Sequence, residues 1–359
     1  MSATPVTIRR RMPSPVRLVR TQSSALGDPL VDTHGRVHRD LRVSLTDRCS
    51  LRCTYCMPEQ GNEWLAKTSI LSLDEIEWVA RVAATDGITT FRLTGGEPLL
   101  RADLPELVAM LAALPGVEDL ALTTNGHLLA RHAEALARAG LHRVTVSLDS
   151  HDEAVFQRMS GGNSSPARVL EGIAAAEAAG LVPLKLNCVV QRGVNDRTIV
   201  DLARRFRGTG HIVRFIEYMD VGTKNAWDPA QVFSAREIVE AIDRELPLEP
   251  AEPNYRGEVA RRWRYRDGAG EIGVIASVTQ PFCGDCTRAR LTAEGALVTC
   301  LFAAGGRDLK EPLRAGATDE ELLAQMAGAW RARADRYSEQ RAQRQRSIPR
   351  RIEMYQVGG

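Results

Sequence analysis

Three cysteines near residue 50 have a spacing suited to an iron–sulfur cluster. Cys49, Cys53 and Cys56 form a C-x3-C-x2-C motif. Three thiolates can bind three irons of a 4Fe–4S cluster and leave the fourth iron open to another ligand. Structural zinc is the alternative, but it normally takes four protein ligands, and no nearby Cys or His supplies the fourth. The motif therefore favours a cluster with one open iron.

A second set of three cysteines follows much later in the chain. Cys283, Cys286 and Cys300 form C-x2-C-x13-C, and zinc is a stronger alternative here because C-x2-C is a common zinc half-site. The chain has 7 cysteines, and the remaining one, Cys188, lies in an apolar stretch typical of a core strand. Two three-cysteine clusters, each with one open iron, are the simplest assignment of the others.

Several cations have positions that favour a bound polyanion. Arg288 and Arg290 are two residues apart in a segment expected to be extended, so both side chains share one face and form a fork suited to phosphate. Lys185, one of few lysines in this arginine-rich chain, lies in an apolar strand. A lysine is rarely buried without a partner, so an anionic ligand would explain it, and the alternative is a lysine that points to solvent from a strand end. Arg42 and Arg92 also have apolar neighbours.

The elements that must position these residues alternate between strand-like and helix-like stretches. We expect strands over residues 41–46, 89–94, 119–123, 143–148, 183–190 and 212–218, and helices near 73–86, 103–114, 127–139, 166–179 and 196–207. Such alternation predicts βαβ units and a parallel sheet. Six units are too few for a closed eight-stranded barrel, so we predict an open, partial (β/α)6 barrel of the TIM type. Polar motifs follow the strands at their carboxyl ends, where such barrels carry catalytic groups.

The chain divides into three expected parts. They are a disordered, Arg-rich lead-in over residues 1–35, the barrel over 36–224, and a smaller C-terminal subdomain over 225–359 packed across the open side of the barrel. In the subdomain, stretches 258–266 and 271–278 flank an Asp-Gly-Ala-Gly turn and predict a β-hairpin, while residues 318–330 predict a helix. The tail ends in Gly358-Gly359.

Composition excludes several classes of protein. No apolar run is long enough to span a membrane, and the start lacks the apolar block and cleavage site of a secretory signal. We therefore expect reduced thiols and a cytoplasmic protein, or a mitochondrial one if the source is eukaryotic. No GxxxxGK phosphate loop is present, which argues against a P-loop NTPase. The basic ends could bind nucleic acid, but aromatic residues are sparse among them, and a small anionic substrate explains them equally well.

The motifs and their order resemble known enzymes. The first cysteine motif, with the aromatic Tyr55 before its last cysteine, and Gly95-Gly96-Glu97-Pro98 after the second strand resemble the radical S-adenosylmethionine (SAM) superfamily. Within it, the chain is similar to the GTP 3′,8-cyclase family of molybdenum cofactor biosynthesis from about residue 36 to 359. The matching stretches are 40–42, 46–49, 94–98, 122–126, 147–149, 214–217, 219–222, the second cysteine set with its arginines, and the terminal Gly-Gly.

This resemblance implies roles for residues at matching positions. The implied SAM-binding 4Fe–4S cluster is held by Cys49, Cys53 and Cys56, and the implied substrate-facing 4Fe–4S cluster by Cys283, Cys286 and Cys300. The implied SAM contacts are Tyr55, Gly96, Ser147 and Met219. The implied GTP contacts are Arg42, Arg92, Thr123, Lys185, Arg288 and Arg290, and the implied catalytic residues are Arg288, Arg290, Gly358 and Gly359.

The activity that the resemblance implies is a radical cyclisation. SAM is cleaved to methionine and a 5′-deoxyadenosyl radical, which takes hydrogen from ribose C3′ of GTP, and the C3′ radical attacks guanine C8. The product, (8S)-3′,8-cyclo-7,8-dihydroguanosine 5′-triphosphate, would pass to cyclic pyranopterin monophosphate synthase. The resemblance also implies a reducing electron donor of the flavodoxin or ferredoxin type, and it admits a homodimer.

Two other functions stay open on the sequence. One is a radical SAM enzyme that modifies a peptide, although such enzymes usually have more than three C-terminal cysteines. The other is a non-catalytic zinc protein that binds nucleic acid through its basic ends. Iron and sulfide analysis of anaerobically purified protein would distinguish the zinc protein from both enzymes.

Overall fold

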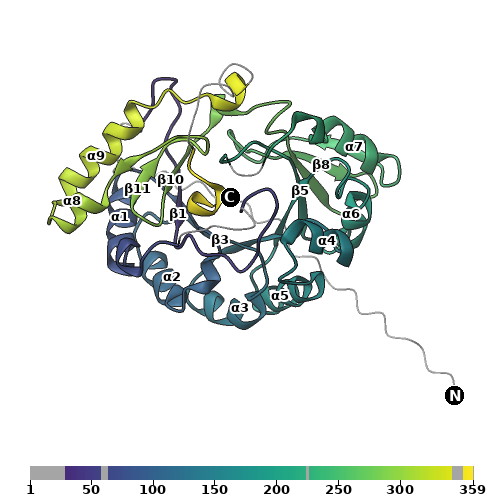
Figure 1. Cartoon of the computed structure of the whole chain (residues 1–359), viewed down its shortest axis with the longest axis horizontal. Coiled ribbons are helices and arrows are strands. Elements are labelled where there is room, and N and C mark those ends of the chain that lie inside the picture. The colour runs from purple at the N-terminus through teal and green to yellow at the C-terminus, as the bar shows by residue number, and fades with distance from the viewer. Residues whose placement is uncertain (1–28, 58–63, 224–225, 342–350, 359) are drawn as a thin grey trace.

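Six parallel strands form the centre of the fold. The computed structural model describes residues 29–57, 64–223, 226–341 and 351–358. The strands lie side by side in chain order, as β1 (Asp40–Ser44), β2 (Thr90–Thr94), β3 (Asp119–Thr124), β4 (Arg143–Ser147), β5 (Lys185–Val190) and β6 (Ile212–Glu217). Figure 1 shows them curving around the middle of the molecule, with helices on the outside. The predicted open, partial barrel is confirmed.

Helices cover the outer face of the barrel. They are α1 (Leu73–Thr85), α2 (Leu104–Ala112), α3 (Leu129–Arg138), α4 (Glu153–Ser160), α5 (Pro166–Ala178) and α6 (Ile199–Phe206), with single 3-10 turns η1 (Lys67–Ser69) and η2 (Pro98–Leu100). α1 begins with a capping box, in which Ser72 Oγ accepts from the Glu75 N–H and the Glu75 carboxylate accepts from the Ser72 N–H. The sequence prediction lacks α4, because its 8 residues are too few for a clear helical period. No helix in the described ranges has the length and apolar character needed to cross a membrane.

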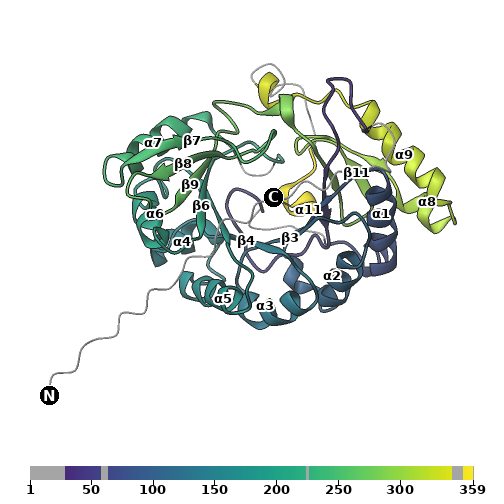
Figure 2. The same cartoon turned by 180° about the vertical axis from the view of Figure 1, so that it is seen from behind.

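The C-terminal third continues the barrel sheet at both edges. Beside β6 lie β9 (Glu271–Ile275), β8 (Arg261–Tyr265) and β7 (Leu248–Ala251), and beside β1 lie β10 (Arg288–Leu291), β11 (Ala296–Val298) and β12 (Arg307–Asp308), which makes a 12-stranded sheet. The remaining elements are α7 (Ala235–Asp243), α8 (Lys310–Arg314), α9 (Asp319–Arg331), η3 (Pro229–Gln231), η4 (Cys283–Asp285) and η5 (Tyr337–Gln340). The predicted hairpin is confirmed, since β8 and β9 pair antiparallel. Thr318 caps α9, as expected. Figure 2 shows the same arrangement from behind.

Residues 29–35, which composition assigns to the disordered lead-in, are ordered in the structure. Val31 pairs with Val37 in an isolated bridge, and Asp32 is buried. Thr33 Oγ1 donates to the Arg333 carbonyl oxygen at 2.7 Å, across 300 residues of sequence. The prediction of disorder is wrong for these residues, because a polar segment can be ordered by a distant part of the chain. Here that part is the segment around Arg333. Residues 1–28 lie outside the described part.

The end of the chain lies in the middle of the barrel. A short helix, α11 (Met354–Val357), lies there in both views of the molecule (Figures 1 and 2). The loop after β6 holds it in place, because the Glu353 carboxylate accepts from Thr223 N at 3.1 Å and from Thr223 Oγ1 at 2.8 Å. The barrel interior is therefore filled partly by the tail of its own chain.

Candidate active site

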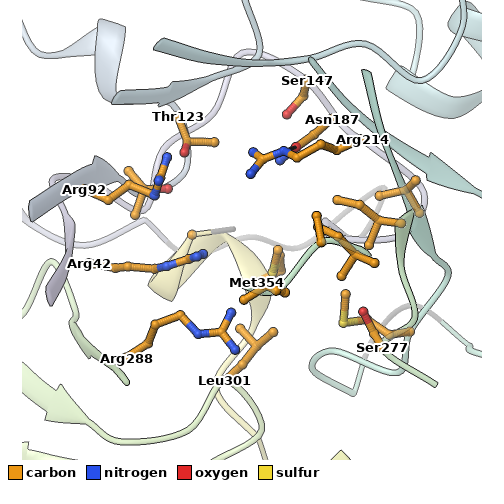
Figure 3. A pocket seen from close by; sticks show the side chains of 18 of the residues that line it. Arg42, Arg92, Thr123, Ser147, Asn187, Arg214, Ser277, Arg288, Leu301 and Met354 are labelled. Atoms are coloured by element: carbon orange, nitrogen blue, oxygen red, sulfur yellow. Dashed lines mark hydrogen bonds between the residues drawn. The ribbon is translucent and has the colours of Figure 1, made fainter. Parts of the chain in front are cut away.

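The barrel interior holds a cavity of about 370 Å³, lined by all six barrel strands and by the C-terminal third. Every residue that the sequence predicts for the site lines this cavity, except Gly359, which lies outside the described residues. These residues are Arg42, Cys49, Cys53, Tyr55, Cys56, Arg92, Gly96, Thr123, Ser147, Lys185, Met219, Cys283, Cys286, Arg288, Arg290, Cys300 and Gly358. Figure 3 shows Thr123 and Ser147 on its wall. The structure thus brings the predicted residues together, and their individual roles stay predictions.

The first cysteine set lies in the loop that follows β1. Cys49, Cys53 and Cys56 are half-buried and form no disulfide. Asn125 Nδ2 donates to Cys49 Sγ at 3.7 Å. Burial, reinforced by the charge of Glu97, raises the pKa of Cys49 to about 12. Without a metal this thiol keeps its proton, and metal binding must release it.

The glycine turn after β2 packs against the cysteine loop with no room for a side chain. Gly96 N donates to the Thr46 carbonyl oxygen at 2.7 Å. A Cβ on Gly96 would lie 2.2 Å from the Arg48 carbonyl oxygen, and Gly95 has a φ of +134°. Only glycine permits this approach of two backbones. The turn therefore fixes the position of the cysteine loop at the cavity wall.

Two buried carboxylates that the sequence prediction does not include brace this side of the cavity. Asp149 accepts a hydrogen bond from Tyr55 Oη at 2.8 Å. Glu97 accepts from Thr124 Oγ1 at 2.7 Å and from Asn125 N at 2.8 Å. Burial raises the pKa of Glu97 to about 7 and that of Asp149 to about 6. Both lie within three residues of the carboxyl end of a barrel strand, which is the sequence signal that could have identified them.

The second cysteine set lies beside β10. Cys283 begins the turn η4, Cys286 follows it, and Cys300 follows β11. Burial acts to raise the pKa of Cys286, but the guanidinium groups of Arg288 and Arg333 outweigh it and lower this pKa to about 6. Burial raises the pKa of Cys300 to about 11. A thiol of low pKa among cations favours the thiolate that a metal needs.

The chemistry of both cysteine sets fits 4Fe–4S clusters. Each set offers three thiols to one cavity, with no disulfide between any of them. In the described part of the chain, no group of three His, Cys, Asp or Glu side chains is arranged for a single metal ion. A cluster is bound at separate irons, so its cysteines need not converge on one point.

A layer of cations crosses the cavity, in which Arg92 and Arg290 are buried and the other members are half-buried. On the adjacent strands β10, β1 and β2, Arg290, Arg42 and Arg92 lie in register. Figure 3 shows Arg42 and Arg92 pointing into the cavity together with Arg288 and Arg214. Burial, with Arg290 as the strongest charged neighbour, holds the pKa of Arg42 well below its usual range. Like charges held out of water are costly until an anion pairs with them, so this layer fits a polyanion.

Lys185 and Arg214 extend the cation layer onto β5 and β6. Burial, reinforced by the charge of Arg214, lowers the pKa of Lys185 to about 7, and burial lowers that of Arg214 to about 9. Arg214 Nε donates to Asn187 Oδ1 at 2.9 Å. On the next strand Gly273 leaves space for this arginine, since a Cβ there would lie 3.1 Å from Arg214 Cγ. The site prediction does not include Arg214, although its in-register position beside Asn187 on the cavity face could have indicated it.

The tail enters the cavity next to the cation layer. Arg290 Nη1 donates to the Gly358 carbonyl oxygen at 2.6 Å. Gly358 has a φ of +62°, and a Cβ on it would lie 2.2 Å from Thr94 Oγ1. A side chain at this position therefore meets both backbone strain and a collision.

Asp220 anchors the tail to the loop that carries Met219. Its carboxylate accepts from Tyr337 Oη at 2.5 Å, from Arg341 Nε at 2.8 Å and from Arg351 Nη1 at 3.1 Å. The Asp220 side chain is 6% exposed. One buried carboxylate thus connects the end of β6 to the chain segment that leads into the cavity.

Comparison with known proteins agrees with the fold and with the predicted family. Residues 43–206 match the Radical SAM superfamily, and residues 211–339 match Molybdenum Cofactor Synthesis C. The fold, the cysteine loop and the first match define a radical SAM enzyme. The chain is 51% identical over 337 residues to the GTP 3′,8-cyclase of Xanthomonas axonopodis pv. citri, with 92% of the chain and 99% of the relative covered. It is 53% identical over 322 residues to that of Acidothermus cellulolyticus, with 88% and 89% covered. The chain belongs to the GTP 3′,8-cyclase family.

Proposed function

We propose that this protein converts GTP to (8S)-3′,8-cyclo-7,8-dihydroguanosine 5′-triphosphate, the first step of molybdenum cofactor biosynthesis. The observation that carries the proposal is one cavity lined by both cysteine sets and by a layer of buried and half-buried cations. Two clusters with open irons and a bound triphosphate account for these features together. A peptide substrate would leave the buried cations unpaired, which disfavours the peptide-modifying alternative.

The cofactors of this reaction are two 4Fe–4S clusters and SAM. Cys49, Cys53 and Cys56 would hold the first cluster, and the second cysteine set would hold the other. When bound, the first cluster and SAM supply the radical that removes hydrogen from ribose C3′. The task of the protein is to hold these groups and the substrate in a fixed relation and to keep water away from them.

The residues proposed to contact SAM are held in place by their neighbours. Tyr55 would contact SAM from a fixed position, because Asp149 accepts a hydrogen bond from its hydroxyl. Gly96 would offer SAM a backbone without a side chain, and its turn packs closely against the cysteine loop. Ser147 and Met219 would complete the SAM contacts from the ends of β4 and β6.

The cation layer would bind the triphosphate of GTP. Its members are Arg42, Arg92, Lys185, Arg288 and Arg290, with Thr123 beside them and Arg214 as an addition from the structure. Without an anion these like charges repel one another and are partly removed from solvent, whereas phosphate oxygens would pair with them and relieve both costs. The Gly358 carbonyl oxygen would help to orient Arg290 for this role, since it accepts a hydrogen bond from that side chain.

We propose further that the reaction takes place in the cytoplasm and that the product passes to cyclic pyranopterin monophosphate synthase. A flavodoxin or ferredoxin type protein would supply the electron for SAM cleavage and a second electron that, with a proton, reduces the guanine-centred radical left by the cyclisation. A homodimer is compatible with this proposal.

The direct test is anaerobic incubation of the reconstituted protein with SAM, a strong reductant and GTP. We expect a product with the mass of GTP that carries a C3′–C8 bond, and deuterium transfer from 3′-deuterated GTP to 5′-deoxyadenosine. ATP in place of GTP is the substrate control, and a Cys49→Ala variant is the enzyme control. SAM cleavage without any GTP-derived product would contradict the proposal and favour the peptide-modifying alternative.

A further inference from the structure

A buried network of charges lies behind the second cysteine set. Arg36 Nε donates to Asp32 Oδ2 at 2.6 Å, and Arg333 Nη1 lies 3.5 Å from the same oxygen. The two arginine side chains are each 2% exposed, and that of Asp32 is 0% exposed. Asp32 and Arg36 precede β1, whereas Arg333 follows α9, so the network joins the two ends of the described chain.

Both arginines bind the backbone of the cysteines themselves. Arg36 Nη1 donates to the Cys283 carbonyl oxygen at 2.8 Å. Arg333 Nη1 donates to the Cys286 carbonyl oxygen, also at 2.8 Å. These bonds hold the cysteine turn by its main chain.

The third cysteine is tied to the same network through Asp335. The Asp335 carbonyl oxygen accepts from Arg36 Nη1 at 2.8 Å, and its carboxylate lies 3.8 Å from Arg333 Nε. The same carboxylate accepts from Thr299 Oγ1 at 2.5 Å, and Thr299 directly precedes Cys300. All three cysteines of the second set are therefore connected to one group of charges, in which Asp32, Arg36 and Arg333 are buried and Asp335 is half-buried.

Trp330 makes the network rigid. Its indole Nε1 donates to the Arg36 carbonyl oxygen at 3.0 Å, and the Arg333 guanidinium lies 4.4 Å from the centre of its ring. Trp330 is 1% exposed. An apolar core would fill this space at a lower cost than two buried guanidinium groups. Both arginines also line the cavity, so their charges act on whatever it binds.

We propose that Asp32, Arg36 and Arg333 are positioning residues, which hold the second cysteine set in the geometry of its cluster and raise the reduction potential of that cluster. The inference rests on the proposed function, because it takes Cys283, Cys286 and Cys300 to bind a 4Fe–4S cluster. Residues around the ligands of a metal site orient these ligands and tune the metal. Positive charge close to a cluster stabilises its reduced, more negative state.

The test separates geometry from charge at one position. Arg333→Lys keeps the charge and loses the forked guanidinium, whereas Arg333→Met loses both. Arg36→Lys makes the first of these changes at the arginine that binds the Cys283 carbonyl oxygen. Arg101→Lys is the matched control, because Arg101 pairs with Asp103 at 2.7 Å and donates to the Leu71 carbonyl oxygen at 3.1 Å, away from the second set. Each full-length variant is reconstituted anaerobically, and iron, SAM cleavage and cluster midpoint potentials are measured.

We expect about eight irons per chain in wild type and in Arg101→Lys, since two cubane clusters carry four each. In both lysine variants the iron content should fall toward about four per chain, while SAM cleavage continues. In the fraction of molecules that still carries the second cluster, its potential should equal the wild-type value. In Arg333→Met the remaining second cluster should have a more negative potential. Wild-type iron and potential in Arg333→Met would overturn the proposal, as would equal loss of both clusters in both lysine variants. About four irons in wild type would instead contradict the second cluster of the proposed function.

Discussion

Replacing Lys185 by methionine should stabilise the ligand-free protein and weaken GTP binding at the same time. Burial, reinforced by the charge of Arg214, lowers the pKa of Lys185 from 10.5 to about 7. This fall in pKa corresponds to a free-energy cost of about 5 kcal/mol for placing the charged lysine in the folded protein. Relaxation of the cavity and water entry reduce the measured value, so we expect the free energy of unfolding to rise by roughly 2 kcal/mol or more. Methionine has a similar length and no charge to desolvate.

The direction of the pH dependence follows from the lowered pKa of Lys185. Between pH 7 and pH 10.5 the unfolded chain binds the lysine proton while the folded protein has lost it, so wild-type stability rises with pH in this window. The stabilisation by Lys185→Met is therefore largest below pH 7, and it shrinks by about 1.4 kcal/mol for each pH unit above that value. Lys67→Met, at an exposed lysine, is the control and should show no such gain.

Two measurements test the Lys185 prediction. Denaturant unfolding of the ligand-free protein at pH 6.5 and 8.5 gives the stability change. Anaerobic calorimetry with GTP gives the affinity, which should fall by about 1.5–3 kcal/mol for a lost charge-assisted contact, or roughly 10- to 150-fold in Kd. SAM affinity should change little. A Lys185→Met protein that is less stable than wild type at both pH values would refute the reasoning, because the lysine would then make favourable contacts without GTP.

Three further predictions concern the other parts of the site. Gly96→Ala should abolish SAM binding, because its Cβ would lie 2.2 Å from the Arg48 carbonyl oxygen and displace the cysteine loop. A wild-type SAM affinity of this variant in equilibrium dialysis would contradict the prediction. Cys283→Ala should lower iron from about eight to about four per chain while slow SAM cleavage continues, and loss of all iron would show that the two sets are not independent. Gly358→Ala should slow GTP cyclisation about 10²-fold with iron unchanged, because the added Cβ would lie 2.2 Å from Thr94 Oγ1. Deletion of the last two residues should do the same, and near-normal turnover would exclude a catalytic role for the tail.

Local patterns were sufficient to predict the barrel strands and many of the residues that line the cavity. In β5, Leu186, Cys188 and Val190 are fully buried, whereas Lys185 and Asn187 face the cavity. This period of two is a property of any strand with one face on a core, so it can be read without a structure. Cys188 is 0% exposed, which confirms its predicted place in the core.

Contacts between distant segments could not be predicted in the same way. Arg36 directly follows the predicted lead-in, and its partner at Cys283 is 247 residues away. Asp220 is tied to Arg351 across 131 residues. A local sequence pattern cannot predict such pairs, because the group that compensates each buried charge lies in another part of the chain. For the same reason the sequence did not predict β10 beside β1.

The order in which a ribosome makes this chain gives the continuous sheet a consequence for folding in the cell. β1 and β6 are made before their partners β10 and β9. Until then both strands expose unpaired backbone groups, which are templates for aggregation. A chain interrupted before residue 271 keeps two such edges and is a natural target for chaperones and proteases. The second cysteine set lies beside β10, so it reaches its place only when β10 joins the sheet. The chain therefore completes its sheet and forms this proposed cluster site at the same stage of folding.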